Sequence, residues 1–174
     1  MAKNCLNKLS GNIAVGCTIP RVGVRDIYLM HAEDVSFTYG PTGEILAAVF
    51  AGGTKSYMVE GYKQNIQVTA SLKTTDVSAR VDTSVTFKVP YFYNTRAFIN
   101  TVVSGKFYVL VRFNDNDITV LGDTSPLECS SADLDSNANA KMITITLASP
   151  EGSAGNLARV ISDAVANTIT SKAV

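Results

Sequence analysis

The feature that most constrains the fold of this chain is a run of alternating apolar and polar residues between Asn65 and Val89. Successive side chains of a β-strand point to opposite faces of the sheet, so this alternation predicts half-buried strands. Thr74-Thr75-Asp76 interrupts the run, and a short polar link between two such strands predicts an antiparallel hairpin. The apolar row consists of Ile66, Val68, Ala70, Leu72, Val77, Ala79, Val81, Val85, Phe87 and Val89. The polar row is mostly uncharged and consists of Asn65, Gln67, Thr69, Ser71, Lys73, Ser78, Arg80, Asp82, Ser84, Thr86 and Lys88.

The predicted hairpin is unusually long. We assign it to residues 57–90, with arms of about 11–13 residues against a usual strand length of about 5–6. At roughly 3.3 Å per residue, each arm spans about 40 Å, which is more than a domain of this size needs to cover its own core. Exposed strand edges are usually shortened or charged unless something pairs with them. The hairpin therefore favours a protein that assembles with copies of itself, because repeating it around a ring closes the edges into a barrel.

The other segments predict a mainly β protein, an antiparallel β-sandwich or barrel formed by residues 1–174 as one domain. Residues 1–25 are predicted to form an N-terminal arm with a short strand at Ile13–Ile19. Further strands are predicted at Asp26–His31, Val35–Tyr39, Lys106–Phe113, Ile118–Leu121 and Lys141–Ala148, with brief pairing at Leu127–Ser131. Glu44–Ala51 fits either a buried strand or a short helix, since periodicity alone does not separate the two for so short a run.

Two helices are predicted. Thr95–Ser104 has Asn94 as a suitable N-cap and Gly105 as a suitable stop, which gives one flanking helix. Residues 156–170 form an amphipathic C-terminal helix, because apolar residues recur at helical spacing. Its stripe consists of Leu157, Val160, Ile161, Ala164, Val165 and Ile169. This helix either packs on its own sheet or docks onto a neighbouring subunit, and in the second case Leu157, Val160, Ile161 and Val165 are the inter-subunit candidates.

Charge excludes several function classes. Lys+Arg and Asp+Glu balance at 15 each, so there is no basic excess of the kind that grips phosphates or anionic membranes. Charged residues make up only 17% of the chain, against about 25% in typical domains. A surface poor in charge fits a protein that is largely covered by neighbours.

The chain is expected to be made in a cytosol and not secreted. Its first residues lack the apolar core of a signal peptide, and no apolar run reaches about 18 residues, so no membrane span is predicted. Cys5, Cys17 and Cys129 are few, odd in number and widely spaced, so reduced and packed thiols are expected.

No catalytic, cofactor or metal site is predicted, and the chain is not expected to be an enzyme. His31 is the only histidine and has no local motif around it, so a nucleophile pair with Cys17 or Cys129 is disfavoured. Gly52-Gly53-Thr54-Lys55-Ser56 lacks the spacing of a phosphate-binding loop and predicts a flexible turn. Asn114-Asp115-Asn116-Asp117 lacks the spacing of a calcium loop and predicts a hairpin turn.

The order of these elements resembles a known family. A Gly/Asn-rich arm precedes long alternating strands, one helix and then β-hairpins. They are followed by the stretch Val120-Leu121-Gly122-Asp123-Thr124-Ser125-Pro126-Leu127-Glu128, then Ser130-Ser131-Ala132-Asp133, and finally Met142-Ile143-Thr144-Ile145-Thr146-Leu147-Ala148-Ser149-Pro150. In this architecture the chain resembles the tail tube (major tail) proteins and related neck proteins of tailed bacterial viruses.

The resemblance implies a virion protein that forms stacked rings, hexameric in this family, through which double-stranded DNA passes without being held. Its partners are then other copies of itself and other tail or neck proteins, with no membrane. It also implies a set of lumen-lining residues on the polar row: Gln67, Thr69, Ser71, Lys73, Arg80, Asp82, Ser84, Thr86 and Lys88. A weakly charged lining suits a conduit, because a basic one would hold DNA by counterion release.

Two alternatives stay open. A head-to-tail neck or connector protein, or a capsid-decoration protein, belongs to the same structural class. A small β-sandwich that binds a ligand or carbohydrate would need clustered exposed aromatics, for which Tyr91, Phe92 and Tyr93 are the candidates.

Overall fold

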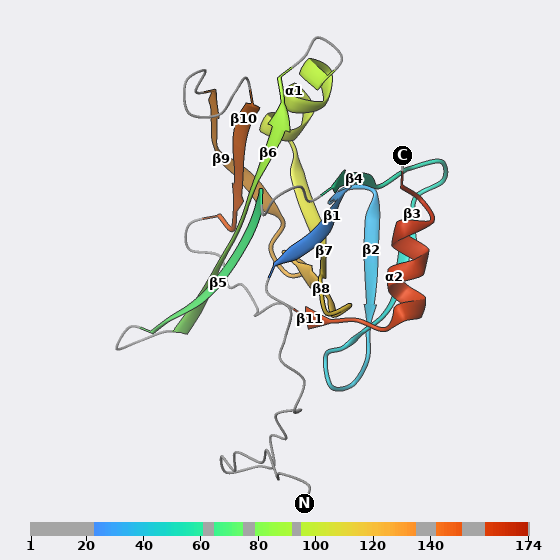
Figure 1. Ribbon diagram of the computed structural model, residues 1–174. Helices are drawn as coiled ribbons and strands as arrows, with labels where there is room; N and C mark the ends of the chain where they lie inside the picture. Colours follow the sequence, from blue (N-terminus) through green and yellow to red (C-terminus); the bar gives the residue numbers. More distant parts are fainter. Residues whose placement is uncertain are drawn as a thin grey trace, which may run out of the picture.

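The computed structural model describes residues 23–60, 65–74, 79–91, 95–134, 142–150 and 159–173 (Figure 1). The strands are β1 (Val24–His31), β2 (Val35–Tyr39), β3 (Ile45–Phe50), β4 (Tyr57–Glu60), β5 (Ile66–Thr74), β6 (Ala79–Pro90), β7 (Lys106–Phe113), β8 (Ile118–Leu121), β9 (Leu127–Leu134), β10 (Met142–Ala148) and β11 (Arg159–Val160). The helices are α1 (Arg96–Ser104) and α2 (Asp163–Thr170).

The strands form one large sheet and one small one. The large sheet has nine strands, in the order β11-β8-β7-β9-β10-β6-β5, with β1 pairing with β7 and β4 pairing with β1. The small sheet is the β2–β3 hairpin. All pairings between these strands are antiparallel. This confirms the predicted fold class, a mainly antiparallel β-protein with a long hairpin, a flanking helix and a C-terminal helix.

The middle of the large sheet is covered on both faces. Ile27 and Leu29 of β1 join one hydrophobic core, while Tyr28 and Met30, on the opposite face, join a second. Strand β7 divides its apolar side chains between the same two cores. Helix α1 contributes to the first core, and α2 with the β2–β3 hairpin forms much of the second. Continuous apolar runs are expected where a strand is covered on both sides.

The predicted hairpin is formed by β5 and β6. Its register pairs Ile66 with Phe87 at one end and Thr74 with Ala79 at the other. At 12 residues, β6 is about twice a typical strand length. In Figure 1 the hairpin extends away from the part of the fold that contains α2.

The structure corrects the predicted extent of the hairpin at residues 57–60. Strand β4 does not belong to it, because Tyr57–Glu60 pairs with β1, matching Leu29 with Tyr57 and Asp26 with Glu60. Pairing between the hairpin arms begins only at Ile66. Alternation shows that a segment is extended but not which strand it pairs with, and β1 supplies the partner here.

The C-terminal helix is also shorter than predicted. Helix α2 begins at Asp163, capped by Ser162, whose Oγ accepts a hydrogen bond from the Val165 amide. Before it, β11 pairs with β8, and the Ile161 amide donates to the Ile118 carbonyl at 3.3 Å. A backbone bonded to a sheet in this way is not available for a helix, which is why residues 159–161 are extended.

Smaller differences concern element ends. Thr95, not Asn94, is the N-cap position of α1, and its hydroxyl donates to the Pro90 carbonyl at 2.6 Å instead of capping the helix. Strand β9 runs on to Leu134, three residues beyond the brief pairing predicted at Leu127–Ser131. Segment 45–50 is a strand, which resolves the ambiguity left by the sequence. The strand predicted at Ile13–Ile19 lies outside the described residues.

Candidate functional site

Strands β5, β6, β10 and β9 lie side by side in this order, and we call this four-stranded antiparallel unit the ribbon (Figure 1). Alternation gives the ribbon two different faces. Val85 and Phe87 of β6, with Ile145 and Leu147 of β10, are fully buried on the apolar face and belong to the first core. The face opposite to them is polar.

The polar face contains the residues predicted to line a lumen. The register places Gln67 opposite Thr86, Thr69 opposite Ser84, and Ser71 opposite Asp82. Residues paired in this way share a face. All the predicted residues with described side chains are exposed or half-buried: Gln67, Thr69, Ser71, Arg80, Asp82, Ser84, Thr86 and Lys88. For Lys73 only the backbone is described, and it pairs with Arg80.

The sequence did not predict the part of the polar face that β10 and β9 contribute. Strand β10 pairs with β6 and places Thr146 beside Thr86 and Thr144 beside Lys88. Strand β9 then adds Ser131 and Asp133 next to those threonines. Alternation predicted β10 as a strand, but nothing local indicated that it would lie against β6.

The polar face is lined largely by hydroxyl groups that bond to one another. The Thr69 and Ser84 hydroxyls lie 2.6 Å apart, and those of Thr86 and Thr146 lie 3.1 Å apart. Ser130 Oγ donates to the Thr146 carbonyl at 3.2 Å. Neutral hydroxyl pairs make the face hydrophilic without adding net charge.

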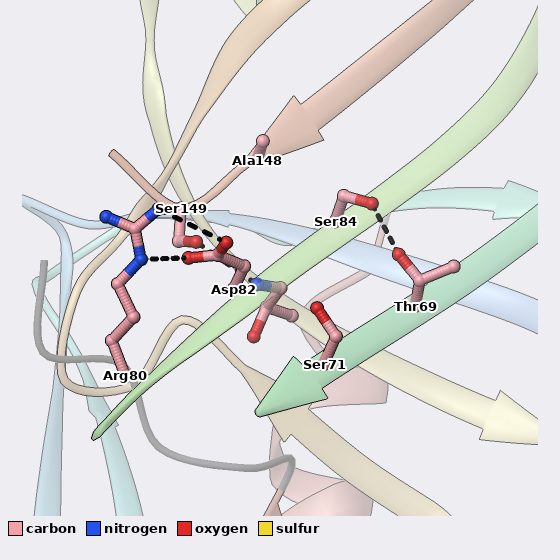
Figure 2. Close-up of a pocket in the computed structure, with 8 residues that line it drawn as sticks. Thr69, Ser71, Arg80, Asp82, Ser84, Ala148 and Ser149 are labelled. Atoms are coloured by element: carbon pink, nitrogen blue, oxygen red, sulfur yellow. Dashed lines mark hydrogen bonds and ion pairs between the residues drawn. The ribbon is translucent and has the colours of Figure 1, made fainter. Parts of the chain in front are cut away.

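Charged side chains on this face form ion pairs, so their charges offset each other. Arg80 Nε lies 3.1 Å from Asp82 Oδ1, and Arg80 Nη2 donates to Asp82 Oδ2 at 3.5 Å (Figure 2). Lys106 Nζ of the adjoining β7 lies 2.7 Å from Glu128 Oε1 of β9. The Arg80–Asp82 pair borders a shallow polar hollow of about 310 Å³, also lined by Thr69, Ser71, Thr83, Ser84, Ala148 and Ser149. Figure 2 shows these side chains around the strands of the hairpin.

In the part of the chain that the structure describes, both outer strands of the ribbon have an edge with little or no strand pairing. Within the described residues, β5 pairs only with β6. Strand β9 pairs with β7 only through Glu128 and Leu127, so its continuation to Leu134 has β10 on one side and no described strand on the other. Open edges present unpaired N–H and C=O groups that another chain can bind.

The apolar face of the ribbon is left uncovered at its extremities. Leu72 near the tip of the hairpin is 59% exposed, and Leu134 at the end of β9 is 51% exposed. Each lies on the apolar face, since Leu72 pairs with Val81 and Leu134 pairs with Ile143. A large apolar side chain is therefore exposed at each of the two outer strands of the ribbon.

Two of the four residues predicted as inter-subunit contacts in the C-terminal helix are buried within their own chain. Ile161 and Val165 are buried in the second core of their own chain, together with Ile169, and so are unable to contact a neighbour. Of the two interpretations, packing on the chain's own sheet therefore describes α2. Val160 is in β11, and Leu157 lies outside the described residues.

The other residues considered for catalysis or ligand binding pack against neighbours or form hydrogen bonds within the fold. His31 packs against Phe107, with ring centroids 4.6 Å apart. The Cys129 thiol donates to the Ser131 carbonyl at 3.3 Å, and burial raises its pKa, which disfavours the reactive thiolate. Ser56 is buried and donates to the Ile169 carbonyl at 2.8 Å. Among the described residues, no group of three or more His, Cys, Asp or Glu side chains is placed to hold a metal ion.

Two of the predicted turns are described. Gly53 has φ +84°, the left-handed region that glycine favours, in the Gly52–Ser56 stretch. Asn116 has φ +71° in the turn between β7 and β8, a conformation that asparagine tolerates.

An apolar groove of about 550 Å³ lies beside β4, the end of β6 and α1, and includes Met58, Val89 and Phe98 in its lining. Tyr91, one of the predicted aromatic candidates, is exposed just after β6. Phe92 and Tyr93 lie outside the described residues.

Comparison with known proteins identifies no relative. A scan against protein-family models finds no match, and searches of curated proteins and of solved structures find none either. In the described part of the chain, no helix is both long and apolar enough to cross a membrane.

Proposed function

We propose that this chain is a structural subunit that assembles with copies of itself into rings, and that these rings stack as the tail tube of a tailed bacterial virus. The observation that carries the proposal is the ribbon, which has one apolar face, one polar face and, as far as the chain is described, two open edges. A strand with an open edge gains backbone hydrogen bonds when another copy extends the sheet. A ring of such subunits forms a barrel that has no edges left.

The strand directions of the ribbon favour closure. Because neighbouring strands of the ribbon alternate in direction, β5 and β9 run antiparallel to each other. When β5 of one copy meets β9 of the next, that new pair is also antiparallel. The sheet then continues around the ring with one pairing mode.

The ribbon is also staggered, as a barrel requires. Strand β6 pairs with β5 from Phe87 to Ala79, but with β10 from Pro90 to Ser84. The tip of the hairpin therefore projects past β10 at one end, and β10 projects past β5 at the other. Closed barrels need tilted strands with this kind of offset.

The size of such a barrel suits a conduit. Six copies, the number in the family that the sequence resembles, contribute about 24 strands at roughly 4.8 Å spacing, and a tilt of about 45° gives a diameter of roughly 50 Å between backbones. The apolar face then packs under the rest of each subunit, and the polar face lines the lumen. Its hydroxyls and paired charges let a polyanion pass with little retention.

Electron microscopy of the purified protein at rising concentration, with light scattering in parallel, tests this function. We expect rings or tubes with an open lumen. Leu72→Lys places a charge on the uncovered apolar end of β5 and is expected to prevent assembly. Val103→Lys is the matched control, because Val103 of α1 is also an exposed apolar residue, at 45%, but lies outside the ribbon.

A protein that remains monomeric at high concentration would contradict self-assembly. It would favour a neck or decoration protein that needs another virion protein as a template. A ligand that binds in the groove beside β4 and α1 would instead favour the binding-module alternative.

A further inference from the structure

The Arg80–Asp82 pair has the geometry of phosphate recognition, with a carboxylate in place of the phosphate. Two guanidinium nitrogens face the two oxygens of Asp82, at 3.1 and 3.5 Å. Arginine binds phosphate oxygens through this same fork of two nitrogens. The Asp82 carboxylate therefore occupies the position at the Arg80 guanidinium that a phosphate group of a nucleic-acid backbone would take.

The surroundings of the pair fit a phosphate as well. The hollow beside it is lined by the hydroxyl groups of Ser71 and Ser149, which can donate hydrogen bonds to anionic oxygens, and by the Thr69–Ser84 pair, in which one hydroxyl donates to the other. Ser71 pairs directly with Asp82 across the two strands. Arg80 and Asp82 are about one-third exposed, at 39% and 32%, so a polyanion in the lumen could reach them.

We propose that Asp82 acts as a built-in substitute for phosphate, which occupies the Arg80 fork and prevents the polar face from holding DNA. This inference rests on the proposed function, since it assigns Asp82 the task of keeping a DNA conduit non-adhesive. Ring closure multiplies its effect, because the pair recurs once in every copy. An unmasked arginine in each copy would bind successive phosphates and release their counterions.

The test is the affinity of purified subunits for a short double-stranded DNA of random sequence, measured by fluorescence anisotropy over a range of salt concentrations. Asp82→Asn keeps the size of the side chain and removes its charge. We expect affinity to rise at least about fivefold, with a steeper dependence of log K on log salt by about 0.9 for each phosphate newly contacted.

Two control variants isolate the cause. Asp117→Asn adds the same net charge on the exposed turn between β7 and β8, and it is expected to bind DNA like the wild type. Arg80→Gln/Asp82→Asn removes the fork itself and is expected to return the affinity to the wild-type level. A similar thermal midpoint for all variants establishes that the fold is kept.

Equal DNA affinity for Asp82→Asn and Asp117→Asn would overturn the inference, because the gain would then follow net charge alone. A gain that survives loss of Arg80 would also overturn it. The proposed function has a separate readout. If Asp82→Asn gains affinity for DNA but microscopy finds no rings, the result supports the masking of Arg80 by Asp82 and contradicts the proposed tail tube.

Discussion

The middle of the large sheet and the ribbon are made of the same kind of strand but differ in how completely one chain covers them. Strands β1 and β7 lie between two cores, and Leu110 of β7 is fully buried. Within the described residues, the ribbon has one core on its apolar face, a polar face without a covering layer, two open edges and an exposed Leu72. The difference indicates that the middle of the sheet is covered within a single chain, whereas the ribbon is where the proposed contact with another copy would form.

The largest expected effect comes from making the same substitution in both regions. Leu110→Ala removes a side chain from the second core and is expected to lower the free energy of unfolding by about 2–5 kcal/mol, from lost burial and the cavity left behind. Leu72→Ala is expected to change it by less than about 0.5 kcal/mol, because that side chain is largely exposed in the isolated chain. Urea unfolding of dispersed subunits measures both. Similar losses at the two positions would contradict the comparison.

A second test concerns the ion pair between Arg159 of β11 and Asp123, which follows β8. Arg159 Nε lies 2.5 Å from Asp123 Oδ2, whose side chain is only 2% exposed. The same guanidinium donates to the Gly43 carbonyl and lies over the Tyr39 ring, with 5.2 Å between Cζ and the centroid. Arg159→Met leaves the Asp123 carboxylate buried without its cation, and we expect a loss of about 3 kcal/mol at neutral pH.

The loss of stability in Arg159→Met should depend on pH. Burial raises the pKa of Asp123 above its ordinary value, and Arg159 partly opposes that rise. Without the guanidinium the pKa rises further, so the folded variant binds a proton more tightly than its unfolded chain. Stability therefore falls as pH increases through the raised pKa, and the deficit is larger at neutral than at acidic pH. Unfolding curves across that range check this, and Arg159→Met/Asp123→Asn should recover much of the loss.

These residues also mark the limit of what could be predicted from the sequence. Alternation predicted β5, β6 and β10, and the apolar run at Lys106–Phe113 predicted β7, because those patterns record burial on one face or on both. The Arg159 contact with Gly43 joins residues 116 positions apart, and the Thr86–Thr146 pair joins residues 60 positions apart. Periodicity carries no information about such partners.

The same limit explains the misplaced start of α2. Ile161 and Val165 are spaced as on a helix, yet Ile161 forms a parallel bridge with Ile45 and lies before the helix. An apolar residue on the core side satisfies either conformation. Only pairing with β8 and β3 decides between them.

For the candidate site, the polar row of the hairpin was predictable, but its extension across β10 and β9 was not.

A third prediction separates folding from assembly. Leu72→Lys is expected to change the stability of the dispersed subunit by less than about 0.5 kcal/mol, since exposed positions tolerate charge. The same change is expected to abolish ring formation, because the charge would have to be buried against the next copy. Comparing unfolding curves with sedimentation profiles measures the two effects. Loss of folding together with assembly would mean that Leu72 is part of the subunit's own core.

The smallest expected effect is on the polar face itself. Thr69→Val keeps the branched shape and removes the hydroxyl that pairs with Ser84. This exposed hydrogen bond contributes little, so we expect a stability change within about 0.5 kcal/mol and unchanged assembly. Thermal unfolding and microscopy check both. A large loss of stability would show that the polar face is held by its hydroxyl pairs and not by the core beneath it.

The most direct test of the central claim is amide hydrogen exchange, read by mass spectrometry, in assembled and dispersed protein. Pairing of β5 with β9 between copies should slow exchange in residues 66–74 and 130–134, because their outward N–H groups gain partners. Peptides from α2 and β7, already covered within one chain, should change little. Protection that appears only outside β5 and β9, with these edges exchanging as fast as before, would contradict assembly through the ribbon.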